Sequence, residues 1–202
     1  RDDVESRGLG DVYKRQILNC AKNFGRLYDI EKATLKNTLK YLSKHQLDFE
    51  NRRLYINSIS SHALDDKDFY AIVNDYGELL EKVVIEMTEQ TEISEDDLDR
   101  IRVRLEKNNM SLAIDDYGTG YSNTSNLLRY DPEVVKIDRS LISGIDQNSK
   151  AQKIVSKMVE YFHSSGYTAL AEGVETSEEL KTMIYFGVDL IQGLSLIHIS
   201  EP

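Results

Sequence analysis

The residues best equipped for chemistry are two adjacent aspartates, Asp115 and Asp116, which end a short apolar run in LAIDDYGTGYS at 112–122. Neighbouring carboxylates repel each other, and burying them without a cation is costly. The pair therefore lies on a solvated surface or holds a metal ion. Because α/β folds build their sites at the carboxyl ends of strands, the position of the pair favours the metal ion.

Polar residues stand at the same end of six successive strand-like runs, at 54–59, 83–87, 112–114, 134–137, 168–171 and 188–191. A charged residue after any one strand is ordinary. Six such ends in series predict a shared site, because the carboxyl ends of parallel strands meet on one face of a βα fold. The residues at these ends are Asn57, Glu86, Thr88, Glu89, Asp115, Asp116, Lys136, Asp138, Glu172, Glu175, Gln192 and Gly193.

These side chains offer oxygen ligands without a cluster of histidine or cysteine, which favours hard cations such as Mg²⁺ or Mn²⁺. Four or more carboxylates are enough for two ions, and two ions can clamp the attacking and leaving oxygens of a phosphoryl displacement. Lys136 then either orients a water or hydroxide, or only forms salt bridges inside the acidic ring. A Schiff-base role for Lys136 is a further alternative, which acidic surroundings disfavour because they keep the amine protonated.

Helical patterns alternate with the strands, which predicts parallel βα units. An open doubly wound sheet and a closed barrel both fit, although the chain has no dinucleotide-binding glycine loop after the first strand. A (β/α)8 barrel typically needs about 250 residues and eight strands, so a barrel with these six strands is truncated. The helices are expected at 28–44, 65–80, 94–107, 152–162 and 177–186, with a short one through Leu127–Leu128.

The composition bounds the class of protein. With 202 residues, of which 40% are hydrophobic, the chain suits one globular domain. A net charge of −10 and the lack of a basic patch argue against a DNA or RNA partner. The single cysteine, Cys20, excludes an internal disulfide and is expected to be a small core residue on a helix face.

Three segments are expected along the chain. RGLGDVYKRQ at 7–16 and SLIHISEP at 195–202 resemble translated sequencing-adapter read-through, so residues 1–16 and 195–202 are expected to be foreign to the domain at 17–194. No apolar run approaches the roughly 20 residues that span a bilayer. We expect a cytoplasmic domain, which a longer parent protein could anchor to a membrane.

Six segments in order and spacing resemble the EAL domain, the cyclic di-GMP phosphodiesterase family, from about Ile17 to Gly193. They are YINSIS at 55–60, VIEMTE at 84–89, IDDYGTGYSN at 114–123, VKIDRSLI at 135–142, AEGVET at 171–176 and IQG at 191–193. The resemblance implies a metal-dependent hydrolase that opens cyclic di-GMP to linear pGpG in bacterial second-messenger signalling. It also implies a modified, TIM-like (β/α)8 barrel, which in this chain is incomplete at both ends.

The resemblance also implies roles for individual residues. Asn57, Glu86, Asp115, Asp116 and Glu172 correspond to metal ligands, for two ions of Mg²⁺ or Mn²⁺. Glu172 is also a candidate general base, and Lys136 corresponds to the lysine that holds the attacking water. Glu89 corresponds to the glutamate that stabilises the loop after Asp116, and Asp138, Glu175 and Gln192 to substrate contacts or to residues that support the ligands.

One departure from the family bears on activity. The Glu-Ala-Leu motif of the first strand, whose glutamate is a metal ligand, is absent, and the adapter-like segment stands in its place. A non-catalytic cyclic di-GMP receptor is therefore the alternative to the enzyme. The resemblance further implies a homodimer near the DDYGTGYS loop and an attached sensor or GGDEF-type domain in the parent protein.

Overall fold

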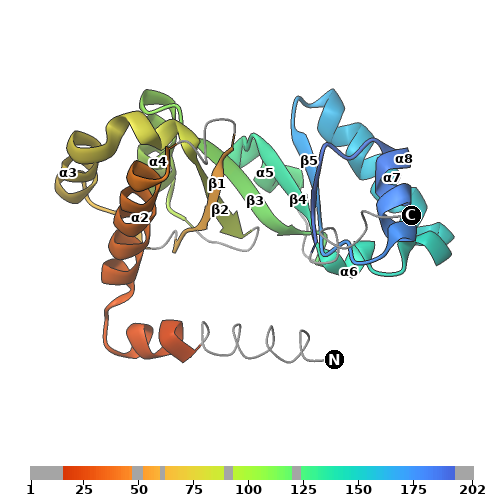
Figure 1. Cartoon of the computed structure of the whole chain (residues 1–202), viewed down its shortest axis with the longest axis horizontal. Coiled ribbons are helices and arrows are strands. Elements are labelled where there is room, and N and C mark those ends of the chain that lie inside the picture. The colour runs from red at the N-terminus through yellow and green to blue at the C-terminus, as the bar shows by residue number, and fades with distance from the viewer. Residues whose placement is uncertain (1–15, 47–51, 60–61, 89–92, 120–123, 194–202) are drawn as a thin grey trace.

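The computed structural model describes residues 16–46, 52–59, 62–88, 93–119 and 124–193. Residues 16–23 are helical and precede the labelled elements (Figure 1). In chain order, these elements are α2 (Leu27–Lys44), β1 (Leu54–Asn57), α3 (Asp66–Tyr76), the 3₁₀ helix η3 (Gly77–Lys82), β2 (Val83–Thr88), α4 (Glu95–Lys107), β3 (Ser111–Tyr117), α5 (Thr124–Tyr130), β4 (Val134–Ile137), α6 (Arg139–Ile142), η4 (Ile145–Gln147), α7 (Ser149–Ser164), β5 (Thr168–Glu172), α8 (Ser177–Phe186) and β6 (Leu190–Gln192).

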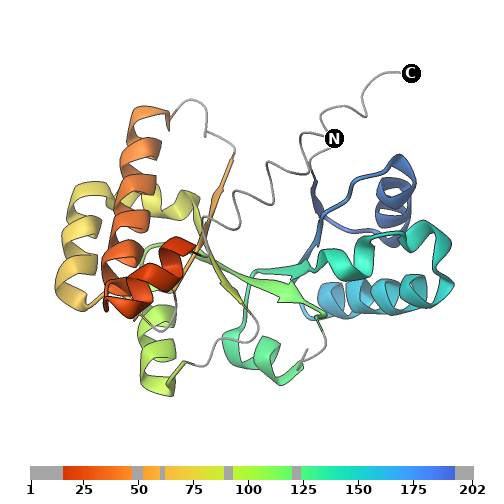
Figure 2. The same ribbon diagram turned by 90° about the horizontal axis from the view of Figure 1, so that it is seen from below.

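The six strands form one parallel sheet in the order of the chain, β1-β2-β3-β4-β5-β6. A doubly wound sheet reverses its strand order at a switch point, so this order rules out that alternative and confirms the barrel-type prediction. The sheet curls into a half-barrel, with α2–α4 gathered at one end and α6–α8 at the other (Figure 2).

Successive side chains along each strand point to opposite faces of the sheet, and both faces are buried. The inner face carries a small apolar layer, and the helix-covered outer face carries two larger apolar clusters. One outer cluster joins α2, α3 and η3 to β1 and the start of β2, and the other joins α4–α8 to β2–β5. The inner layer consists of Val84, Ala113, Val134 and Leu170, with Tyr55 packed against it.

The main differences from the predicted elements are local. The helix expected to reach residue 80 ends at Tyr76 and continues as η3, β3 extends to Tyr117, and β6 begins at Leu190 instead of Val188. The predicted caps are confirmed at Ser94, which accepts from the Asp97 amide, and at Gly187, which has a left-handed conformation.

The expectation for Cys20 is wrong. It lies on a helix but is exposed, because the 16–23 helix stands away from the sheet and Ala21 is its single buried residue (Figure 1). Of the segment expected to be foreign at 1–16, only Gln16 is described, and 195–202 lies outside the described residues. Among the described helices, none combines the length and apolar character that crossing a membrane requires.

Candidate active site

Lys136 lies at the centre of an acidic cluster at the carboxyl ends of the middle strands. Its Nζ is 2.6 Å from Glu86 Oε1, 2.9 Å from Asp115 Oδ1 and 2.6 Å from Glu172 Oε1. The Lys136 side chain is only 3% exposed, and Glu86 is 7% exposed. A buried ammonium is tolerable here because three carboxylates accept its three N–H groups.

Regular strand alternation brings these residues together. Each follows an inner-face apolar residue by two positions, as Glu86 follows Val84 and Lys136 follows Val134. Since side chains two apart in a strand share a face, the site forms a second layer above the apolar one. The pairs are Tyr55 and Asn57, Val84 and Glu86, Ala113 and Asp115, Val134 and Lys136, and Leu170 and Glu172.

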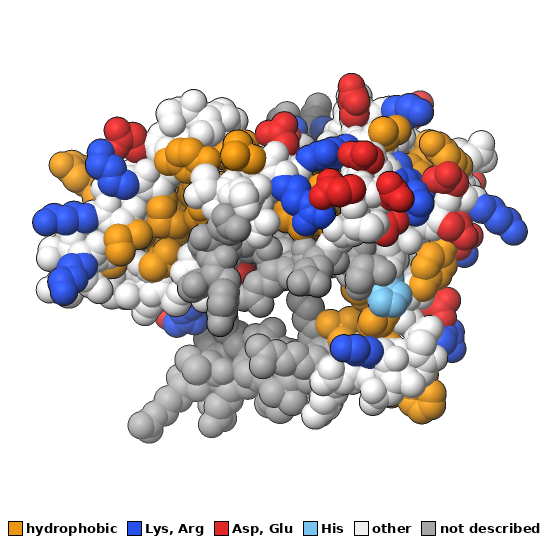
Figure 3. Space-filling model, turned by 180° about the vertical axis from the view of Figure 1, so that it is seen from behind, with side chains coloured by type: hydrophobic (Ala, Val, Ile, Leu, Met, Phe, Trp, Pro, Cys, Tyr) orange, Lys and Arg blue, Asp and Glu red, His pale blue; other side chains and the backbone are white. Residues whose placement is uncertain are grey.

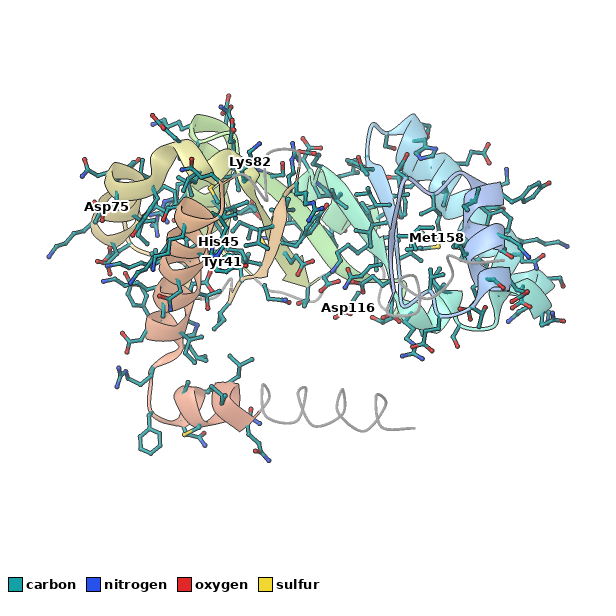
Figure 4. The ribbon with its side chains drawn as sticks, viewed as in Figure 1. Tyr41, His45, Asp75, Lys82, Asp116 and Met158 are labelled. Atoms are coloured by element: carbon teal, nitrogen blue, oxygen red, sulfur yellow. The ribbon has the colours of Figure 1, made fainter. Side chains whose placement is uncertain are left out.

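Asp116 would face the opposite side of a regular strand, yet a backbone irregularity brings it to the site. The β3–β4 register shifts between Ile114 and Tyr117, and Asp116 has a left-handed φ of +58°. Such a bulge re-aims a side chain. Carboxylate oxygens of Asp115, Asp116 and Glu172 consequently lie within 4.8 Å of one another. Asp116 marks the lower edge of the sheet in Figure 4.

The electrostatics of the cluster follow from burial and mutual proximity. Burial alone lowers the pKa of the Lys136 ammonium, but its hydrogen bonds to Glu172, Glu86 and Asp115 raise that pKa above its ordinary value. Burial raises the pKa of Glu172. Burial, followed by the charge of Asp115, raises the pKa of Asp116. The site therefore holds more negative charge than its one ammonium neutralises, and a cation would relieve it.

The other predicted site residues lie around this centre. Asn57 is in register with Glu86 on the neighbouring strand, and Gln192 is in register with Glu172. Asp138 caps α6 by accepting from the Ser140 amide at 2.9 Å, and its charge contributes to the raised pKa of Asp116. Glu175 accepts from Arg139 Nη2 at 2.8 Å. Glu89 lies outside the described residues.

Two helical carboxylates, the half-buried Glu31 and the buried Glu179, support the site and were not predicted from the sequence. Glu31 of α2 accepts from the Ser58 hydroxyl and the Ile59 amide, directly after Asn57. Glu179 of α8 accepts from three backbone amides of loops beside the site. Glu179 could have been found as the fourth residue of a Thr-x-x-Glu capping box that begins at Thr176. No sequence signal marks Glu31.

Gly173 fixes the path of the chain directly after Glu172. Its φ is +65°, and a Cβ at this position would lie 2.6 Å from Cγ of Arg139. The Arg139 side chain can therefore cross this residue to reach Glu175 only because Gly173 has no side chain.

A curled parallel sheet with an acidic, lysine-centred site at the strand ends defines a protein of the TIM-like barrel class. Within that class, the chain belongs to the EAL domain family, whose model matches residues 3–198.

Two curated relatives differ in what their names describe. "Cyclic di-GMP phosphodiesterase PdeL" of Escherichia coli is 31% identical over 190 residues, covering 91% of this chain and 52% of the relative. The "Blue light- and temperature-regulated antirepressor BluF" of the same species is 26% identical, covering 82% of this chain and 42% of the relative. This chain thus spans about half the length, or less, of these curated relatives.

Among solved structures, a manganese and cyclic di-GMP complex of Klebsiella pneumoniae BlrP1 has a TM-score of 0.72 and 30% identity. The match covers 83% of this chain and 43% of BlrP1. A calcium and cyclic di-GMP complex of BlrP1 matches with the same TM-score and 31% identity, covering 84% of this chain and 43% of BlrP1.

Proposed function

We propose that this chain forms the core of a metal-dependent phosphodiesterase that hydrolyses cyclic di-GMP to linear pGpG. The observation that carries the proposal is the buried Lys136 held by Glu86, Asp115 and Glu172, with Asp116 turned toward the same point. Membership of the EAL family and the relatives named as cyclic di-GMP phosphodiesterases support the choice of substrate.

The donor set fits hard divalent cations, since every candidate ligand binds through oxygen. We propose that two ions of Mg²⁺ or Mn²⁺ are held by Asn57, Glu86, Asp115, Asp116 and Glu172. The three carboxylates whose oxygens lie within 4.8 Å of one another support this assignment. When bound, such ions polarise a phosphoryl group and lower the pKa of coordinated water.

The chain's own residues supply positioning and proton transfer. Lys136 is protonated at neutral pH, and once one of its three carboxylate partners turns to a bound cation, the released N–H can donate a hydrogen bond to the attacking water and fix the water's direction of approach. Glu172 lies in contact with Lys136 and has a raised pKa, which suits a general base. As the water oxygen bonds to phosphorus, Glu172 takes up the water proton, the bond from phosphorus to one sugar oxygen breaks, and that oxygen takes up a proton from solvent.

The test uses variants that remove one role at a time. Lys136→Ala and Glu172→Gln should each lower cyclic di-GMP hydrolysis by about 100-fold or more, the scale of a lost acid–base or positioning group. Binding of cyclic di-GMP should partly survive. Turnover is followed by chromatography of pGpG with Mg²⁺ or Mn²⁺, and Glu160→Gln on the exposed face of α7 is the control. Wild-type turnover in either site variant would refute that residue's role.

A non-catalytic cyclic di-GMP receptor is the second candidate. The relative named as an antirepressor favours it, because that name refers to regulation and names no reaction. One measurement distinguishes the enzyme from the receptor. A receptor binds cyclic di-GMP and returns it unchanged with every divalent metal, whereas the enzyme releases pGpG with Mg²⁺ or Mn²⁺ and is inhibited by Ca²⁺, a weaker Lewis acid of looser geometry.

We further propose that the intact domain works as a homodimer in the cytoplasm, joined in its parent protein to a sensor or GGDEF-type domain. The length of the relatives, about twice this chain or more, supports attached domains. Light scattering of the intact domain with and without cyclic di-GMP tests the dimer. A monomer under both conditions would contradict it.

A further inference from the structure

The end of β1 is held from outside the barrel by a side chain that the proposed chemistry does not use. Glu31 of α2 accepts from Ser58 Oγ at 2.6 Å through one carboxylate oxygen and from the Ile59 amide at 2.7 Å through the other. Because side chains alternate along the strand, Ser58 faces α2 while Asn57 faces the site. Glu31 thus holds the two residues that directly follow a candidate metal ligand.

The other side of the same segment is held by the sheet. The Ser58 amide donates to the Glu86 carbonyl at 2.9 Å, and Asn57 is in register with Glu86. Among the described strands, β1 pairs only with β2. The position of Asn57 therefore depends on two attachments, one to the backbone of β2 and one to the carboxylate of Glu31.

We propose that Glu31 is a positioning residue that sets the Asn57 side chain at the metal site by holding the Ser58–Ile59 segment. The inference rests on the proposed function only in taking Asn57 as a metal ligand. Groups that orient a ligand typically contribute about 10–100-fold to metal affinity. The carboxylate acts here through its two acceptor oxygens, and its charge is not required.

The test measures Mn²⁺ affinity by electron paramagnetic resonance on the full chain, without substrate. Glu31→Ala should weaken Mn²⁺ binding about 10-fold or more. Glu31→Gln should stay within about 3-fold of wild type, since its amide oxygen can accept from Ile59 while its amide nitrogen donates to Ser58. Asp29→Ala removes an exposed carboxylate from the same helix and should change nothing.

A double-mutant cycle separates positioning from a general loss of structure. If Glu31 acts through Asn57, the double variant of Glu31→Ala and Asn57→Ala should bind Mn²⁺ as Asn57→Ala alone does. Additive losses, or a Glu31→Gln variant as weak as Glu31→Ala, would overturn the inference. Hydrogen exchange of the Ile59 amide should accelerate in Glu31→Ala and not in Glu31→Gln.

The outcomes also distinguish this inference from the proposed function. If Asn57→Ala weakens Mn²⁺ binding but Glu31→Ala does not, the inference fails and the metal site stands. If Asn57→Ala leaves the affinity unchanged, Asn57 is no ligand and the inference falls with that assignment. If wild type binds no Mn²⁺, both fail.

Discussion

At the scale of single residues, the site depends on a backbone exception at Asp116. Regular alternation would send Asp115 and Asp116 to opposite faces, and the bulge with its left-handed residue turns both toward Glu172. Aspartate and asparagine tolerate this conformation better than most residues. Aspartate at position 116 therefore tolerates the left-handed backbone and also supplies a carboxylate to the site.

The charge of Asp116 should cost stability when no metal is bound. Burial and Asp115 raise its pKa, so its ionised form is disfavoured in the folded chain. Asp116→Asn should therefore stabilise the chain at pH 7 in a chelator, by less than about 1 kcal/mol because the side chain is partly exposed. With Mn²⁺ wild type should instead be more stable than Asp116→Asn, because only wild type gains the full free energy of metal binding.

Urea unfolding with EDTA and with Mn²⁺ measures both arms of this prediction. Asp131→Asn is the matched control, since Asp131 has a comparable positive φ of 45° and lies outside the acidic cluster. The idea fails if Asp116→Asn and Asp131→Asn shift the urea midpoint alike under both conditions.

At the scale of elements, α8 is tied to the site by Glu179. Its carboxylate accepts from the amides of Gly144 at 2.8 Å, Glu175 at 2.9 Å and Thr176 at 3.1 Å. Burial raises the pKa of Glu179, but these amides, Gly144 first, lower it more, so the net shift is downward. A lowered pKa means that folding favours the ionised form.

Glu179 should consequently make stability depend on pH. Its contribution is complete above the ordinary glutamate pKa of 4.5 and is lost as the pH falls through the lower folded value. Glu179→Gln should lower the free energy of unfolding by about 1–3 kcal/mol at pH 7, because a buried amide group replaces one acceptor oxygen. The difference in the free energy of unfolding between Glu179→Gln and wild type should narrow below pH 4.5.

Urea midpoints between pH 7 and pH 3 test this, with Glu160→Gln as a control at an exposed position. A gap that stays constant over the whole range would show that ionisation of Glu179 contributes nothing to stability.

The sequence predicted these elements well because its signals were local. Apolar runs located all six strands, and caps such as Ser94 located helix ends. Strand ends then placed Glu86, Asp115, Lys136 and Glu172 together, since alternation and parallel pairing are regular. The bulge at Asp116 and the contact from Glu31 to Ser58 were not predictable, because one depends on strand pairing and the other joins residues 27 apart.

At the scale of the whole molecule, the described sheet is open. Strands β1 and β6 each pair on one side only, and unpaired strand edges invite association with other chains. Figure 3 shows acidic and basic side chains interspersed over part of one face. Such mixed charge favours solubility but covers no sheet edge.

We expect the 202-residue chain by itself to be poorly stable and weakly active. Adding a first strand that carries the glutamate of the Glu-Ala-Leu motif should raise hydrolysis about 10-fold or more, since it supplies a further ligand and covers β1. Turnover and urea unfolding of both chains measure this. A cooperative, fully active monomer of the shorter chain would contradict the prediction.

The division of the outer core into two apolar clusters has a consequence for motion. One cluster attaches α2, α3 and β1 to the start of β2, while the other secures β3–β5. Parts of a protein that share one apolar cluster can unfold locally as a cooperative unit. Local unfolding of the α2–β1 unit would carry Asn57 away from Glu86 and Lys136. Local unfolding of this unit and complete metal ligation then exclude each other. The metal concentration would therefore set how often the α2–β1 unit unfolds and how readily proteases cleave it.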